Sequence, residues 1–345
     1  MLSRVANSIY WMSRYLERAE NVARFIDVNL NLTLDLGEGV KQQWEPLVAI
    51  SGDLKPFTER NKTSSRDAVL RFLAFDLENP NSIVSCLRSA RENARTIREI
   101  LPTELWEELN KIYLTVRGTD PDAVVDQPHE MLMRVKNGSH LIVGLIEGCM
   151  SCGEAWHFAN MGRLLERADK TSRILDVKYF ILLPSVTEVG MPVDLIQWSS
   201  LLKSASAFQM YHRSRGRITP AQVADFLILE RQFPRSMHFC LIHAEKSLSE
   251  ITGSPRGRGV TSAEQQLSRL GSQFDFAYID DIIEEGLHEF IDRFQTRLNL
   301  VDDAIFETFF AIRPLVQAGP ESSMAGPSAS AASTSAGPSQ SQSQS

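Results

Sequence analysis

The stretch that decides the fold reads Arg14-Tyr15-Leu16-Glu17-Arg18-Ala19-Glu20-Asn21-Val22-Ala23-Arg24, and a close copy reads Arg163-Leu164-Leu165-Glu166-Arg167-Ala168-Asp169-Lys170-Thr171-Ser172-Arg173. Apolar residues recur around the first copy at alternating spacings of three and four: Ile9, Met12, Leu16, Ala19, Ala23, Ile26 and Leu30. This is the period of an amphipathic helix, and it predicts one helix from Ser3 to Leu34.

A second stripe, this one charged, lies one residue further along the same helix, about 100° around its axis. It consists of Glu17, Glu20, Arg24 and Asp27, and the second copy repeats it as Glu166, Asp169, Arg173 and Asp176. A solvated face does not require the same charges in the same order twice. Three interpretations of the stripe remain open. Its charges could form ion pairs at the protein surface or a buried polar seam between the two copies. Alternatively, its carboxylate and guanidinium groups could bind a charged ligand.

The composition is that of an ordinary globular protein, with 345 residues, 43% of them apolar and 23% charged. The net charge of −7 argues against a nucleic-acid partner held by bulk electrostatics. No run of about 18 apolar residues could span a membrane, and the N-terminus lacks the apolar region of a signal peptide. The 4 cysteines are too few for a disulfide framework in so long a chain. We expect a cytoplasmic protein with no membrane partner.

Further matches between the two halves follow in the same order along the chain. They pair Trp44 with Trp198, Pro80 with Pro234, Ser82 with Ser236, Cys86 with Cys240, and His129 with His288. Collinear matches over so long a stretch indicate a tandem duplication, and strand-like alternation is nearly absent. We therefore predict an all-α fold, a helical bundle built from two tandem-duplicated halves, about 1–150 and 151–317, in a pseudo-twofold relation.

The segments around these helices are predicted from local signals. Residues 55–65 are expected to form a loop and residues 118–128 a linker, whereas Ser82 is expected to cap a helix over 83–101. From Ala318 the chain consists mostly of Gly, Pro, Ser, Ala and Gln. Such a composition cannot bury enough apolar surface to offset ordering entropy, so residues 318–345 are predicted to be a disordered tail.

The helix expected over 83–101 carries a stripe of four arginines, Arg88, Arg91, Arg95 and Arg98. Like charges repel unless acids or an anion face them, and Glu17 and Glu20 are natural partners. We therefore expect these acids within salt-bridge reach of Arg91 or Arg95. The second half has no equivalent arginines, which favours a single centre that includes the motif Ala90-Arg91-Glu92-Asn93-Ala94-Arg95.

Other chemistries have weaker signals. Glu154-x-x-His157 has the spacing of a carboxylate-bundle metal ligand pair, but neither Glu17 nor Glu166 has a histidine three residues further on, so no metal site is predicted. Cys149-x-x-Cys152 lacks a second cysteine pair for zinc and a thioredoxin-like surrounding for redox chemistry. The sequence names no cofactor.

Three motifs resemble the bacterial alpha-E domain family: Tyr10-Trp11-Met12 followed by Arg14 to Glu20, the Ala90–Arg95 motif, and Glu154-Ala155-Trp156-His157-Phe158 followed by Gly162 to Ala168. The resemblance runs from about Leu2 to Pro314 and implies an all-helical alpha-E domain over 1–317. It also implies partners, an ATP-grasp-type ligase and a transglutaminase-like protein, and a role in ATP-dependent peptide or amide chemistry.

Three functions follow as hypotheses. The leading one is an accessory or substrate-binding subunit that holds a charged peptide or amino-acid ligand through its Glu/Arg cluster. Its binding residues would be Arg14, Arg18, Glu20, Arg24, Arg91, Glu92, Asn93, Arg95, Arg163, Arg167, Asp169 and Arg173. The second is an amide-bond hydrolase or transferase with Glu17 or Glu166 as general base. The third is a helical scaffold with a buried ion-pair seam.

Overall fold

The computed structural model describes residues 1–36, 44–180, 192–255 and 259–311, and every regular element in these ranges is a helix. The predicted all-α class is therefore confirmed. None of these helices is both long and apolar enough to cross a bilayer. The predicted disordered tail, 318–345, lies outside the described residues.

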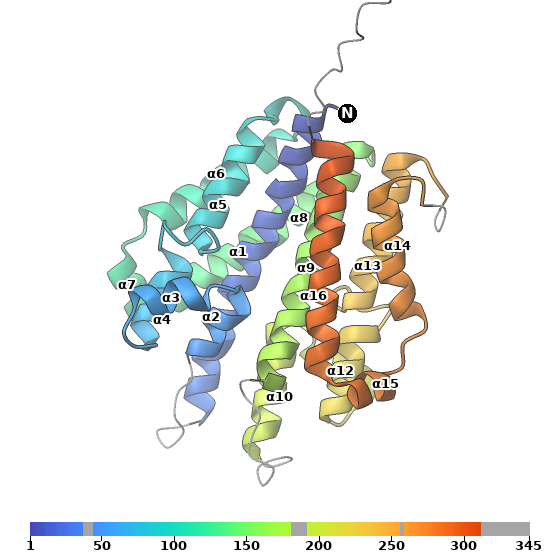
Figure 1. Ribbon diagram of the computed structural model, residues 1–345. Coiled ribbons are helices and arrows are strands. Elements are labelled where there is room, and N and C mark those ends of the chain that lie inside the picture. The colour runs from blue at the N-terminus through green and yellow to red at the C-terminus, as the bar shows by residue number, and fades with distance from the viewer. Residues whose placement is uncertain (37–43, 181–191, 256–258, 312–345) are drawn as a thin grey trace, which may run out of the picture. The chain divides into compact units, whose positions relative to one another are not determined.

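Two long helices run side by side through the middle of the bundle, α1 (Ser3–Leu36) and α9 (Glu154–Phe180) (Figure 1). They are parallel, because Tyr10 lies against Gly162 near their N-terminal ends and Arg18 lies against Glu166 further along. The predicted stripe Ile9 to Ile26 is fully buried in the core that these helices share. The predicted first helix is confirmed, and it continues two residues further, to Leu36.

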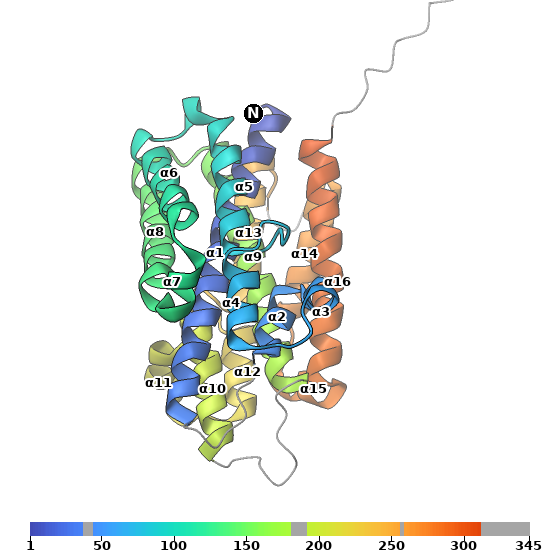
Figure 2. The same cartoon turned by 90° about the vertical axis from the view of Figure 1, so that its left-hand side faces the viewer.

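Further helices cover the two sides of this central pair (Figure 2). On the α1 side lie α5 (Ile83–Arg95), α6 (Thr103–Gly118) and α8 (Pro128–Cys149), and on the α9 side lie α13 (Met237–Thr252), α14 (Ser262–Asp275) and α16 (Leu287–Ile305). The short elements at one end are α2 (Glu45–Ser51), α3 (Leu54–Arg60), α4 (Arg66–Ala74), α7 (Pro121–Asp126), α10 (Pro192–Ser204), α11 (Phe208–Arg215), α12 (Pro220–Leu229) and α15 (Ile279–Glu285). A π-helical turn, η2 (Phe306–Phe310), follows α16.

Matched positions in the two halves make matched local contacts. Ser82 caps α5 by accepting a hydrogen bond from Ser85, and Ser236 caps α13 by accepting one from Phe239. In the first turn of each of these helices a cysteine sulfur lies 3.6 Å from the carbonyl oxygen of the proline six residues earlier. The cap predicted at Ser82 is thus confirmed, and the turns that start α5 and α13 share this serine cap and this cysteine–carbonyl contact.

The loop predicted over 55–65 is wrong in its first half, because residues 54–60 form α3. Pro56 lies in the first turn, where proline is tolerated because its missing N–H has no helical partner. Phe57 anchors the helix: it is fully buried, and its ring packs edge-on against Phe72 with centroids 5.0 Å apart.

The linker predicted over 118–128 is also partly helical. Asp120 accepts a hydrogen bond from the backbone of Asp122 and caps α7, Pro121 occupies its first turn, and Val124 and Val125 are buried. Helix α5 ends at Arg95, earlier than predicted, because the Thr96 hydroxyl donates to the Asn93 carbonyl oxygen and a short 3-10 turn follows (η1, Arg98–Ile100).

The closest approach of α1 and α9 depends on Gly162. A β-carbon at this position would lie 2.5 Å from the backbone oxygen of Tyr10, which no side-chain rotation can relieve. Gly162→Ala is therefore expected to lower the free energy of unfolding by about 1–3 kcal/mol. Differential scanning calorimetry should show a melting temperature lower by several degrees.

Gly144 supplies the matched control for this change. It lies in α8, and a β-carbon there meets nothing within 4 Å. Gly144→Ala should leave the melting temperature unchanged or raise it slightly, because alanine has the higher helix propensity. A Gly162→Ala protein as stable as the native one would contradict the close crossing of the two helices.

Candidate functional site: a buried Glu–Arg cluster

Two reciprocal ion pairs join α1 to α9. Arg167 donates from Nε and Nη2 to the two carboxylate oxygens of Glu17, at 2.8 Å each. Arg18 donates in the same way to Glu166, at 2.6 and 2.9 Å. Both are two-pronged guanidinium–carboxylate contacts, the geometry that combines two charge-assisted hydrogen bonds.

The reciprocity follows from the sequence. Each helix carries the dipeptide Glu-Arg, as Glu17-Arg18 on α1 and Glu166-Arg167 on α9. Because the two helices are parallel and the dipeptides lie at the same height, the glutamate of each helix faces the arginine of the other. Both carboxylates are deeply buried, with Glu17 3% and Glu166 0% exposed.

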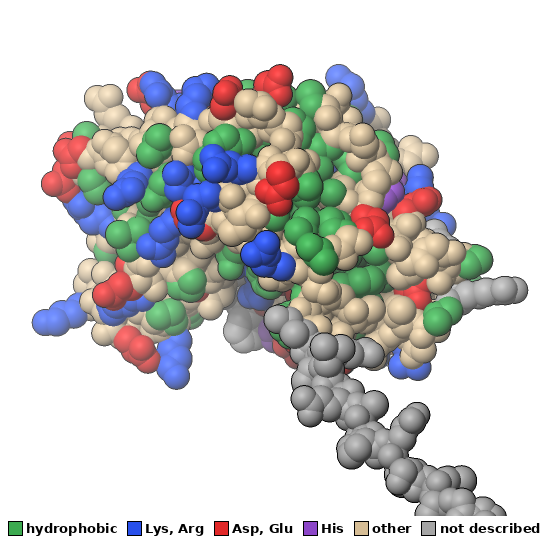
Figure 3. Space-filling view, turned by 90° about the horizontal axis from the view of Figure 1, so that it is seen from above, with side chains coloured by type: hydrophobic (Ala, Val, Ile, Leu, Met, Phe, Trp, Pro, Cys, Tyr) green, Lys and Arg blue, Asp and Glu red, His purple; other side chains and the backbone are tan. Residues whose placement is uncertain are grey.

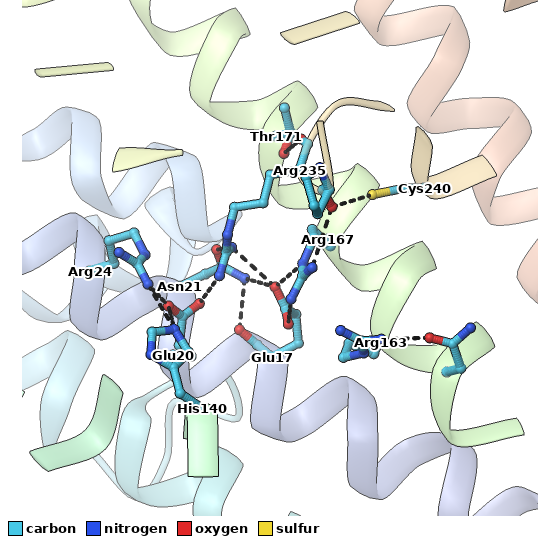
Figure 4. Close-up of polar contacts among 12 residues, drawn as sticks. Glu17, Glu20, Asn21, Arg24, His140, Arg163, Arg167, Thr171, Arg235 and Cys240 are labelled. Atoms are coloured by element: carbon cyan, nitrogen blue, oxygen red, sulfur yellow. Dashed lines mark hydrogen bonds and ion pairs between the residues drawn. The ribbon is translucent and has the colours of Figure 1, made fainter. Parts of the chain in front are cut away.

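Glu17 belongs to a larger network that reaches α13's N-terminal turn (Figure 4). Arg235 donates to Glu17 at 3.2 Å and to Glu20 at 2.9 Å. Asn21 also donates to Glu17, at 3.1 Å. Glu20 also forms an ion pair with Arg24 of its own helix.

Glu166 is surrounded in a comparable way. Arg14 donates to it at 3.0 Å, and the Lys170 ammonium group lies 3.6 Å from it. Arg14 also pairs with Asp302 at the end of α16, at 2.6 Å, and Tyr10 donates to the same carboxylate at 2.8 Å. The cluster thus ties α1, α9 and α16 together.

The cationic partners keep the buried carboxyl groups ionised. Burial alone would raise the pKa of Glu17, but the charges of Arg167 and Arg235 outweigh it and lower the pKa below its usual value. Burial opposes ionisation of Glu166 as well, yet Arg18, Lys170 and Arg14 hold its pKa well below the usual value. Both glutamates are therefore carboxylates at neutral pH, with strongly bound counter-charges.

The charged stripe becomes more accessible toward the other end of the helices. Asp27 on α1 accepts from Lys136 of α8 at 2.6 Å and lies 2.9 Å from His129 Nδ1. Asp176 on α9 lies 2.6 Å from His288 Nδ1 of α16, and this contact raises the pKa of His288. The stripe therefore runs from a closed centre to a partly exposed end.

The predicted contact of Glu17 or Glu20 with Arg91 or Arg95 is wrong. Arg91 donates instead to Asn110 and Glu92, and Arg95 donates to Glu92. The reason is the direction of the stripe: α5 packs on α1 through its apolar face, Ala90 and Ala94, which turns the arginines away. Lys and Arg side chains gather over the α5–α6 side of the bundle in the view from above (Figure 3).

Asn93 also lies outside the cluster, where its side chain donates to the backbone of Ser89 in the same helix. The motif Ala90–Arg95 is thus separate from the carboxylates that it was expected to face. Three other predicted residues lie at the margin of the cluster. Arg163 pairs with Asn160 and Glu147, while Asp169 pairs with Arg173 and Lys170.

Sequence reasoning missed several members of the cluster, which are Tyr10, Asn21, Asn81, Lys170, Arg235 and Asp302. A signal for Arg235 was present, because it lies between Pro234 and Ser236, the turn residues that match Pro80 and Ser82. Its counterpart, Asn81, accepts from Arg18 at 2.6 Å. No pattern in the sequence pointed to Asp302.

The potential metal ligands and the cysteines lie as follows. Among the described residues, no group of three or more His, Cys, Asp or Glu side chains could hold a metal ion. Burial raises the pKa of Cys86 and of Cys240 to about 12, so neither thiol ionises at neutral pH. Cys149 and Cys152 are exposed free thiols.

Comparison with known proteins gives a family but no function. The model of the Alpha-E family, described as a predicted alpha-helical domain with a conserved ER motif, matches residues 1–310. Uncharacterized proteins of Mycobacterium bovis and Mycobacterium tuberculosis are 22% identical to the chain over 302 residues. The match covers 81% of this chain and 33% of each relative, so the chain spans about a third of their length. No solved structure matches it.

Breaking one buried pair should be costly. Glu17→Gln removes the charge that compensates Arg167 and Arg235 and is expected to destabilise the fold by about 3–5 kcal/mol, measured by urea unfolding. Glu92→Gln removes two ion pairs near the surface, with Arg91 and Arg95, and should cost at most about 1 kcal/mol. An equal loss of unfolding free energy in the two variants would contradict the claim that burial makes the Glu17 ion pairs more important to stability than those of Glu92.

Stability should also depend on pH through these carboxylates. The charge of Arg235 and contacts with His140 and Arg24 outweigh burial and hold the pKa of Glu20 well below its usual 4.5. The unfolded chain therefore binds this proton more readily, so the stabilisation is complete above about pH 5.5 and is lost as pH falls through 4.5 toward the folded pKa. The difference in melting temperature between the native protein and Glu20→Gln should shrink from pH 7 to pH 3.

Proposed function

The chain belongs to the Alpha-E family, and from this we propose that it is an accessory, partner-docking subunit of an ATP-grasp-linked system for peptide or amide synthesis or modification. In this proposal the partners are an ATP-grasp-type ligase and a transglutaminase-like protein. The Glu–Arg cluster holds the subunit's two central helices in a fixed register, and the catalysis belongs to the partner.

One observation carries this proposal: the carboxylates of the cluster are saturated by donors from within the chain. Arg167, Arg235 and Asn21 occupy Glu17, and Arg18, Arg14 and Lys170 occupy Glu166. A general base must reach the proton that it removes and must have a free lone pair facing the substrate. Buried carboxylates that are already paired support a structural role.

The exposed end of the charged stripe offers a place for a charged peptide or amino-acid ligand. His129 and His140 have side chains that are 70% and 58% exposed, and they stand beside the buried carboxylates of Asp27 and Glu20. The exposed imidazoles are the groups that a ligand at this end would meet, because the Glu20 side chain is only 1% exposed and is already paired with Arg24 and Arg235. Of the predicted binding residues, Glu20 and Arg24 lie beside His140.

An amide-bond hydrolase or transferase, with Glu17 or Glu166 as general base, is the alternative. It would require the Glu–Arg pairs to open and to expose a carboxylate whose pKa is held low, which makes it a weak base. The geometry favours the accessory role over this one.

We also propose that the two halves arose by tandem duplication. The reciprocal Glu–Arg pairs, the matched caps at Ser82 and Ser236, and the histidine–aspartate contacts His129–Asp27 and His288–Asp176 support it.

A double substitution separates an architectural cluster from a catalytic or substrate-binding one. In Glu17→Gln with Arg167→Met both charges of one pair are removed, and Arg235 keeps Glu20 and Asn21. The double variant should recover part of the stability that Glu17→Gln alone loses, because no unpaired arginine remains at position 167. The measurement is urea unfolding of all four members of the cycle.

The same folded double variant should still bind a co-expressed ATP-grasp-type ligase within about threefold of the native dissociation constant and support its turnover. Retained folding with lost turnover would reject the architectural role and favour the hydrolase or substrate-binding alternative. Failure of the native chain to bind the ligase, measured by calorimetry, would reject the proposed partnership itself.

A further inference from the structure

Arginines of α5, η1 and α6 alternate with aromatic residues of α6 in a series that the proposed function does not use. The Arg98 guanidinium lies 5.4 Å from the ring centre of Trp106, and Arg91 lies 5.6 Å from the same ring. Arg91 also lies 5.3 Å from the ring centre of Tyr113, and Arg117 lies 6.0 Å from it. Cation–π contacts of this kind fix the positions of guanidinium groups without neutralising their charge.

A hollow lies at the lower end of this series, at the junction of α4, α5, α6 and α7. Its volume is about 390 Å³, within the range of small-molecule sites. Val84, Val116, Phe75 and Leu77 give it apolar walls. The backbone turn from Thr119 to Pro121 closes one side.

Three polar side chains that line the hollow lack a partner for their polar groups. Arg88 and Arg117 are exposed, and neither forms an ion pair with any residue that the structure describes. Tyr113 is only 6% exposed as a whole residue, but its hydroxyl oxygen is accessible and makes no hydrogen bond within the described ranges. This hydroxyl is therefore free to donate to a ligand in the hollow.

We propose that this hollow binds a terminal carboxylate that carries an apolar side chain, either the C-terminus of a peptide or a free acylated amino acid. The carboxylate pairs with Arg88 and Arg117 and accepts from the Tyr113 hydroxyl, while the apolar side chain lies against Val84 and Val116. This site lies on a different face from the Glu–Arg cluster, and the inference does not rest on the proposed function.

The combination of charge and shape selects this ligand class. The two guanidinium groups donate hydrogen bonds and accept none, and the hydroxyl can donate one more, so together they recognise an oxyanion. The apolar walls add affinity only for a ligand with an apolar body, which a bare inorganic anion lacks. An extended polyanion fits poorly, because Glu92 pairs with both Arg91 and Arg95 and leaves the rest of the stripe without a continuous positive charge.

Isothermal titration calorimetry of the full chain tests the proposal with four probes: N-acetyl-L-phenylalanine, its amide, the tripeptide Gly-Gly-Phe, and the amide of that tripeptide. The two acids should bind, and each amide should bind at least about tenfold more weakly, because it offers no charge to the arginines. Tighter binding of the tripeptide than of the acetylated amino acid identifies a peptide terminus as the ligand. Equal binding identifies the amino-acid moiety.

Substitutions locate the binding. Arg88→Met and Arg117→Met should each weaken binding of the acids at least about tenfold, and Tyr113→Phe should weaken it about fivefold. Arg98→Met is the matched control, because it removes the same charge from the same stripe at a position that does not line the hollow. It should change binding less than about twofold.

Three results would overturn the proposal. They are no heat of binding from either acid up to about 10 mM, equal binding of acids and amides, and an equal loss in Arg98→Met and Arg88→Met. Melting temperatures of the variants exclude a folding defect, since both arginines are exposed and their loss should shift melting by no more than a few degrees.

Discussion

The structure depends on the cost of keeping ionised carboxylates out of water. A buried carboxylate without a counter-charge is so unfavourable that the fold must bring cations to it, and here the cations come from distant parts of the chain. Glu17 is 150 positions from Arg167 and 218 from Arg235. The close approach at Gly162 and the two-pronged pairs favour the same register of α1 against α9.

The same constraint explains why the cluster is symmetric at its centre and asymmetric at its edges. At the centre each helix offers one glutamate and one arginine, so the charges balance within the pair. Further out, Glu20 of α1 faces Arg235 and Arg24, whereas Asp169 of α9 faces its neighbours Lys170 and Arg173. Helices α1 and α9 therefore carry the same Glu-Arg dipeptide at the centre and differ in the cations around it.

The central helix and several residues of the Glu–Arg cluster could be predicted from the sequence. The partners of these residues could not, and the reason is physical. The spacing of apolar residues predicted α1 and its buried face, because that spacing is a local property of the sequence. The repeated charges at Glu17 and Glu166 marked the right residues, but spacing along a helix does not say which other helix faces a given charge. The arginines of α5 are the predicted partners because they form a stripe of opposite charge on a helix of the same half. In the structure, Ala90 and Ala94 face α1 and the arginines point elsewhere. Asp302 and Arg235 join the cluster through long-range packing that no local pattern encodes.

The reciprocal pairing also sets the order of events during synthesis. When α1 leaves the ribosome, its Glu17 has no partner, because Arg167 is made 150 residues later. At a synthesis rate of about 5–20 residues per second, the charges of α1 lack their partners on α9 for about 8–30 seconds. During that interval the first half cannot dehydrate its charged stripe at an acceptable cost and must remain hydrated or loosely packed. The two central helices therefore pack late, when α9 emerges and supplies the missing charges. The cluster is complete only after Arg235 has been synthesised.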